Sequence, residues 1–193
     1  MKMNTGLTIG ILLIVILSTG LIFYKSNSHK QDQKVKKTKI TENPYLGLRT
    51  QALNTTPEQL QIQISDEREL FGIVMDWNIG KAIVTVTSFK TGDASLYMST
   101  GQAFIGGFAH EEVSNAAKEF VMIGNKYISR AVKTEKLDPT QLKKVDFYFL
   151  TKSGIYYLEE DLSLIENGQS DLGELFNAGN QVITEYRLIT DNK

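Results

Sequence analysis

The sequence predicts an α+β protein in which an N-terminal transmembrane helix precedes one two-layer domain. Two observations lead to this fold class. An uncharged, apolar run comes first, and strand-like runs paired by tight turns then alternate with helices that carry one apolar stripe. We expect a five-stranded, mostly antiparallel sheet in the order β-β-β-α-β-β-α, with helices on one face. The expected parts are an anchor over residues 1–24, a basic flexible linker over 25–43 and a globular domain over 44–193.

The anchor is predicted by residues 7–24, which are almost wholly apolar. Roughly 20 such residues span a hydrocarbon core of about 30 Å. The run is longer than the roughly 7–15 apolar residues of a cleaved signal peptide, and Phe23-Tyr24 is no small-residue cleavage site, so we favour an uncleaved, single-pass anchor.

Six lysines follow the apolar run, against Lys2 alone before it. They are Lys25, Lys30, Lys34, Lys36, Lys37 and Lys39. The positive-inside rule therefore predicts a protein of the cell membrane with its domain in the cytoplasm. The same lysines could contact anionic lipid. A conventional signal anchor, which would place the domain outside the cell, remains the alternative.

Composition excludes several kinds of chemistry. The chain has no cysteine, which excludes disulfides, thiolate zinc sites and a cysteine nucleophile. From Pro44 onward, 14 lysine and arginine residues stand against 20 aspartates and glutamates, a formal charge of −6. This acidic balance argues against a nucleic-acid partner, because such binding depends on neutralising phosphates. No cofactor is expected.

The first half of the domain is predicted to form a short helix and three strands. Thr56 as N-cap, Pro57 and Gln59 are typical of a helix start within residues 54–60. The strands are expected at 70–78, 82–89 and 94–99, joined by turns at 78–81 and 90–93. On the first strand, Ile73, Met75 and Trp77 would share one face.

The second half is predicted to form two helices around a hairpin. A long helix is expected over 110–132, with Gly124 on its apolar stripe marking close packing against the sheet. Strands at 145–150 and 155–158 follow. The last helix is expected over 171–188, opened by a capping box of Asp171 and Glu174.

The most site-like stretch is glycine-rich and precedes the long helix. It contains Gly101, Gly106, Gly107 and His110, whose backbone amides could cradle an anion at the helix N-terminus. A phosphate-binding loop would need a Lys-Ser/Thr pair after Gly106, and Gly107-Phe108 stands there instead, so a nucleotide site is not expected. A glycine-rich crossover packed closely against the sheet is the interpretation that we favour.

A second candidate is the acidic patch of Glu159, Glu160 and Asp161 at the end of the last strand. It could bind a divalent cation or a basic partner surface, although a solvated strand end is the interpretation that we favour. His110 is the only histidine of the domain, so no metal site is predicted. Asp76, which precedes Trp77 in the sequence, is a weaker candidate for a catalytic general acid.

Three runs carry a resemblance to known sequences. They are residues 43–60, 92–101 and 159–162. In these runs the chain resembles a group of small bacterial proteins with no assigned activity, whose members are soluble and lack an anchor. The resemblance extends over most of residues 43–188, supports a cytoplasmic domain, and implies no site residues.

The leading functional hypothesis is a non-enzymatic domain that serves protein interaction or regulation. The absence of a cysteine nucleophile, a histidine pair and a complete phosphate loop favours it over catalysis. An extracytoplasmic domain that binds or senses a ligand is the alternative. A carboxylate- or metal-dependent hydrolase that uses Asp76, Asp161 or Glu166 is a third hypothesis.

Overall fold

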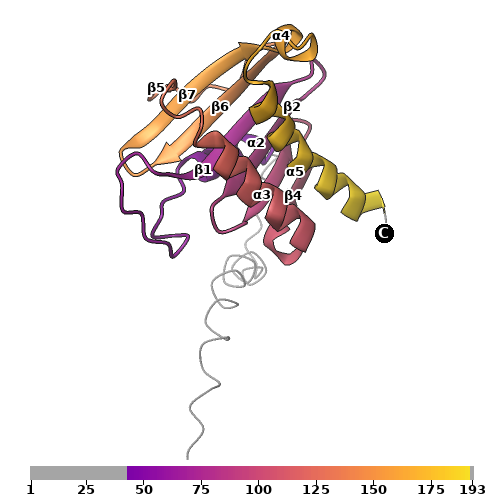
Figure 1. Ribbon diagram of the computed structural model, residues 1–193. Coiled ribbons are helices and arrows are strands. Elements are labelled where there is room, and N and C mark those ends of the chain that lie inside the picture. The colour runs from indigo at the N-terminus through magenta and orange to yellow at the C-terminus, as the bar shows by residue number, and fades with distance from the viewer. Residues whose placement is uncertain (1–42, 192–193) are drawn as a thin grey trace, which may run out of the picture. The chain divides into compact units, whose positions relative to one another are not determined.

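A seven-stranded antiparallel sheet organises residues 43–191, which are the residues that the computed structural model describes (Figure 1). The elements, in chain order, are α2 (Tyr45–Leu53), β1 (Leu70–Asn78), β2 (Ile83–Phe89), β3 (Ala94–Met98), β4 (Ala103–Ile105), η1 (Gly107–Ala109), α3 (Glu111–Gly124), β5 (Val132–Lys133), β6 (Lys144–Thr151), β7 (Gly154–Asp161), α4 (Leu162–Glu166) and α5 (Gly173–Asp191).

The strand order is β4-β3-β2-β1-β6-β7-β5, so β1 lies at the centre of the sheet. Its register places Asp76 opposite Thr85 on β2 and opposite Asp146 on β6. The β2–β3 turn requires a glycine, because Gly92 has a φ of +92°. The three predicted strands β1, β2 and β3 and their turns are therefore confirmed, with bounds within one residue.

One face of the sheet is covered by α3 and α5, which lie side by side in front of it in Figure 1. Phe120 of α3 and Leu175 of α5 are buried in this core together with Ile73 and Met75 of β1. Gly124 lets α3 approach closely, since a Cβ there would lie 2.8 Å from Leu70 Cδ2. The predicted role of that glycine is confirmed.

The opposite face carries a second core, which contains α2. Tyr45 and Leu53 of α2 pack there with Phe71, Val74 and Tyr148 of the sheet. In Figure 1, α2 lies behind the strands, on the side away from α3 and α5. The prediction that all helices cover one face is therefore wrong.

The predicted strand count is also wrong, because the sheet has seven strands rather than five. The two additional strands, β4 and β5, are three and two residues long. β4 forms in the glycine-rich stretch by pairing with β3, and β5 forms by pairing with β7. Strands this short are fixed by their neighbours rather than by their own sequence.

Three helix boundaries differ from prediction. α3 ends at Gly124, and turns follow it where the apolar stripe predicted continued helix.

The capping box of Thr56 and Gln59 forms, with N···O distances of 2.9 and 3.4 Å, but it opens only a turn that ends at Gln61 with a φ of +56°. Asp171 and Glu174 form no capping box with each other and instead pair with Arg130 and Lys126.

The transmembrane part of the predicted fold class is not found among the residues that the structure describes. Within residues 43–191, no helix is long and apolar enough to cross a membrane. The anchor at 7–24 and the lysines of the linker lie outside the described residues. The fold class is therefore corrected to an α+β domain in which helices cover both faces of a seven-stranded antiparallel sheet.

Candidate functional site

A buried ion pair joins α2 to the centre of the sheet. Arg49 donates from Nε and Nη2 to Asp76 Oδ2, at 2.7 and 2.6 Å, and the two side chains are only 3% and 0% exposed. Thr85 donates to the other carboxylate oxygen of Asp76, and the Tyr45 hydroxyl lies 2.9 Å from Thr85 Oγ1. Burial raises the pKa of Asp76, and the charge of Arg49 opposes that shift.

Arg49 also fixes the segment that precedes β6. Its Nη1 donates to the carbonyl of Leu137 at 2.6 Å, and its Nη2 donates to the carbonyl of Asp138 at 3.2 Å. The Tyr148 hydroxyl donates to the same Asp138 carbonyl at 2.9 Å. These bonds hold residues 134–143, which we call the capping loop, against β6 and β7.

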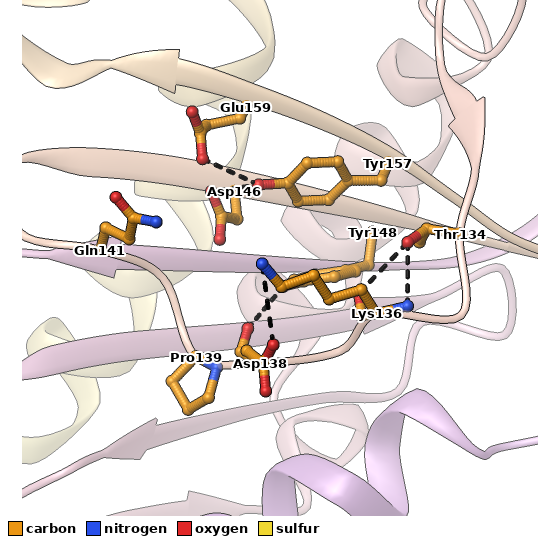
Figure 2. Close-up of a pocket in the computed structure, with 9 residues that line it drawn as sticks. All are labelled: Thr134, Lys136, Asp138, Pro139, Gln141, Asp146, Tyr148, Tyr157 and Glu159. Atoms are coloured by element: carbon orange, nitrogen blue, oxygen red, sulfur yellow. Dashed lines mark hydrogen bonds and ion pairs between the residues drawn. The ribbon is translucent and has the colours of Figure 1, made fainter.

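A cavity of about 220 Å³ lies between the capping loop and the two strands (Figure 2). It is lined by Thr134, Lys136, Asp138, Pro139 and Gln141 of the loop, by Asp146 and Tyr148 of β6, and by Tyr157 and Glu159 of β7. The register of the sheet produces this grouping, because Asp146 pairs with Glu159 and Tyr148 pairs with Tyr157. We call it the Asp146 cavity.

Asp146 is the most deeply buried charged group of the cavity, with 3% of the residue exposed. The Tyr157 hydroxyl donates to Asp146 Oδ1 at 3.0 Å and also lies 3.1 Å from Glu159 Oε2. Burial raises the pKa of Asp146 to about 6, the bond from Tyr157 opposes this shift, and the negative charge of Asp76 adds to it.

The cations near the cavity are paired with other carboxylates. Lys144 lies 2.9 Å from Glu159 and 3.1 Å from Asp161, and Lys136 lies 3.9 Å from Asp138. Among the residues that the structure describes, none forms an ion pair with Asp146. The carboxylate of Asp146 is therefore held by the hydrogen bond from Tyr157 rather than by an ion pair.

Two tyrosine rings form the wall beside this carboxylate. The rings of Tyr148 and Tyr157 are 5.2 Å apart, and the guanidinium of Arg49 lies 5.2 Å from the centre of the Tyr148 ring. Burial raises the pKa of both tyrosines, with the charge of Asp146 adding to the shift, so both hydroxyls stay protonated at neutral pH. Carboxylate oxygens and aromatic faces together can stabilise a cation.

The glycine-rich stretch that was a candidate anion site connects β3 to α3 in the structure. Gly101 lies in the β3–β4 turn, and Gly106 precedes η1 with a φ of +86°. A Cβ on Gly107 would lie 2.4 Å from the Tyr186 hydroxyl, so the chain packs closely here, as the favoured interpretation expects. His110 is the N-cap residue of α3, and its side chain makes no capping hydrogen bond.

In the predicted acidic patch, Lys144 bridges Glu159 and Asp161, and Glu160 is directed to another partner. Glu159 lines the Asp146 cavity, whereas Glu160 accepts a hydrogen bond from Ser170 at 2.7 Å. Asp161 pairs with Lys144. Within residues 43–191, no group of three or more histidine, cysteine, aspartate or glutamate side chains is placed to hold a metal ion.

Sequence reasoning missed Asp146 and Arg49. One signal was available for Asp146, because it is the single charged residue within the otherwise apolar run 145–150. A carboxylate at such a position is unusual in a strand that is buried on both faces. Arg49 gave no comparable signal, since an arginine in a helix is ordinarily solvated.

No protein-family model matches the chain, and no curated protein and no solved structure matches it.

Proposed function

We propose that residues 43–191 form a protein-interaction domain that accepts a basic side chain of its partner, a lysine in the first instance, in the Asp146 cavity. One observation carries the proposal. A nearly buried carboxylate lies in an open cavity and has no cation partner among the described residues. Buried carboxylates in proteins are ordinarily paired, so this group lacks the partner that would compensate its charge.

The surroundings of Asp146 favour an ammonium group over other ligands. Glu159 lies beside it in the cavity, and Asp76 lies opposite it on β1. The partly exposed ring of Tyr157 adds a surface on which cations are stabilised, whereas the buried ring of Tyr148 is already covered by Arg49. Arg49, Lys144 and Lys136 are already paired with Asp76, Glu159 and Asp138, so the remaining negative charge is that of Asp146, which would repel an anion and attract a cation.

The size of the cavity favours a side chain over a whole metabolite. Its volume of about 220 Å³ is below the roughly 300–1,000 Å³ of ordinary small-molecule sites. A lysine side chain would fill it while the partner's backbone rests on the capping loop. This arrangement agrees with the interaction role expected from the sequence.

The test is a titration of the full chain, purified in a mild detergent, with Nα-acetyl-lysine methylamide. We expect saturable shifts of the backbone amide signals of Asp146, Tyr148 and Tyr157 in NMR spectra. The uncharged analogue Nα-acetyl-norleucine methylamide should cause none. Asp146→Asn should weaken binding roughly 10- to 100-fold, as expected for the loss of a charged hydrogen bond.

Glu135→Gln is the matched control. It removes the same charge from the exposed part of the capping loop, outside the cavity lining, and should leave binding unchanged. Equal binding by Asp146→Asn and the unaltered protein would contradict the proposal.

A photo-crosslinking residue in place of Gln141, at the rim of the cavity, tests the protein partner in cells. A crosslinked protein that disappears with Asp146→Asn and persists with Glu135→Gln supports the interaction role. If only free amines bind and no such crosslink forms, the domain binds small ligands instead.

A further inference from the structure

The sheet has an open edge at β4. Met98 donates its backbone N–H to the carbonyl of Gln102 at 2.8 Å, which fixes the hydrogen-bonded positions of the β3–β4 ladder. Because those positions alternate in an antiparallel pair, the N–H and C=O groups of Ala103 and Ile105 point away from β3. No residue of the described part of the chain bonds them, and Figure 1 shows β4 at the border of the sheet.

This edge lacks the features that usually protect an edge strand. The stretch 103–109 contains no charged residue and no proline, although such residues commonly block pairing with another chain. Ile105 is 66% exposed, and Phe108 is 65% exposed. Two large apolar side chains within four residues, next to free backbone groups, are typical of a surface that a partner covers.

An acidic groove begins at Ala109, the last residue of this stretch. It is lined by Ala109, His110, Glu111, Glu112, Glu185, Leu188 and Ile189, and its volume is about 450 Å³. Among the described residues, no lysine, arginine or histidine forms an ion pair with any of the three glutamates. The edge therefore combines strand-pairing groups, apolar side chains and negative charge.

We propose that β4 binds an extended, basic segment of a partner protein, which adds an eighth strand to the sheet. Its backbone would pair with Ala103 and Ile105, its apolar side chains would cover Ile105 and Phe108, and its lysines or arginines would face the glutamates. This site lies apart from the Asp146 cavity and does not depend on the function proposed for it.

Charge decides between this partner and a second copy of the chain. Pairing two β4 edges about a two-fold axis would bring two sets of Glu111, Glu112 and Glu185 to one interface. Like charges placed in this way are costly, whereas a basic strand compensates them.

The probe is a fluorescein-labelled peptide of alternating lysine and valine, six residues long, added to the full chain in detergent. We expect saturable binding by fluorescence anisotropy, weakened at least tenfold by Ile105→Pro, which removes the outward N–H. A proline is tolerated on an edge strand, and unchanged thermal unfolding would confirm that the variant folds. Phe108→Ser, which leaves the strand intact, should weaken binding several-fold.

Two controls separate strand addition from other binding. Met122→Ser removes an equally exposed apolar side chain from α3, three turns away from Glu111, and should change nothing. A peptide N-methylated at alternate residues keeps its charge and should bind at least tenfold more weakly.

Equal binding of the methylated peptide would overturn the proposal in favour of electrostatic adsorption. A dimer in analytical ultracentrifugation that Ile105→Pro dissociates would show a second copy as the occupant. Lysines of the peptide can also enter the Asp146 cavity, so the effect of Ile105→Pro is measured in the Asp146→Asn background as well. The same loss of binding in both backgrounds is expected, which keeps failure of this proposal distinguishable from failure of the Asp146 cavity.

Discussion

Arg49 is the residue on which the candidate site depends most. It pairs with a fully buried carboxylate and holds two carbonyls of the capping loop. Removing one partner of a buried pair leaves the other charge uncompensated, which costs more than the pair contributes as a whole. Arg49 therefore has a structural role, because it holds the capping loop that forms one wall of the Asp146 cavity.

We predict that Arg49→Met lowers the free energy of unfolding by about 3–5 kcal/mol, because Asp76 is left buried without its cation. The double variant Arg49→Met with Asp76→Asn should recover most of this loss, since Thr85 can still donate to the new side chain. Urea unfolding followed by circular dichroism measures both. A loss below about 1 kcal/mol in the single variant would show that the pair is not buried as described.

Asp146 should make the stability of the domain depend on pH. Its pKa is raised from 3.8 to about 6 on folding, so the folded state holds the proton more tightly than the unfolded state. The resulting stability is fully present below about pH 4 and is lost as the pH rises through about 6, by roughly 2–3 kcal/mol.

Asp146→Asn should abolish this part of the pH dependence and should be the more stable protein at pH 7, because it buries no charge. Urea unfolding between pH 4 and pH 7 compares the two proteins. Parallel stability curves over that range would contradict the shifted pKa of Asp146.

Elements with strong local signals were predicted well, and elements made by tertiary contacts were missed. β2 is rich in β-branched residues, β1 and β3 show alternating patterns, and glycine turns join the three, so their sequence specifies them. β4 and β5 are too short to specify themselves. The helix predicted to reach residue 132 ends at Gly124, and apolar residues after it, such as Tyr127 and Ala131, join the core without being helical.

α2 was missed for a related reason. Its buried residues include Arg49, and its apolar residues do not form one stripe. The Asp146 cavity was missed because it joins side chains of β6, β7 and the capping loop, a grouping that depends on strand register. Glu159 was anticipated as one part of an acidic patch.

Two glycines test the description of the elements. Gly47 lies in α2 with open space around a Cβ, so Gly47→Ala should stabilise the protein by about 0.5–1 kcal/mol. Gly92 has a φ of +92°, and a Cβ there would lie 2.1 Å from Ser114 Oγ, so Gly92→Ala should destabilise it by at least about 1 kcal/mol. Thermal unfolding that gave both changes the same sign would contradict this placement.

At the scale of the whole molecule, one sheet supports two cores. Phe120 is buried on the face of α3 and α5, and Phe71 is buried on the face of α2. Because both cores pack on the same strands, residues 43–191 should unfold as one cooperative unit.

Phe120→Ala and Phe71→Ala should each lower the free energy of unfolding by about 3–5 kcal/mol. Each should shift the same single transition, monitored by circular dichroism and by tryptophan fluorescence. Two separate transitions, of which each variant shifts only one, would show that the cores fold independently.

The measurement that tests the central claim most directly is a carboxyl-carbon NMR titration of Asp146, with and without saturating Nα-acetyl-lysine methylamide. We expect a pKa of about 6 for Asp146 in the free protein, lowered when the ammonium group lies beside the carboxylate. By linkage, the probe should also bind more tightly as the pH rises through 6. A titration of Asp146 that the amine leaves unchanged would show that no cation enters the cavity.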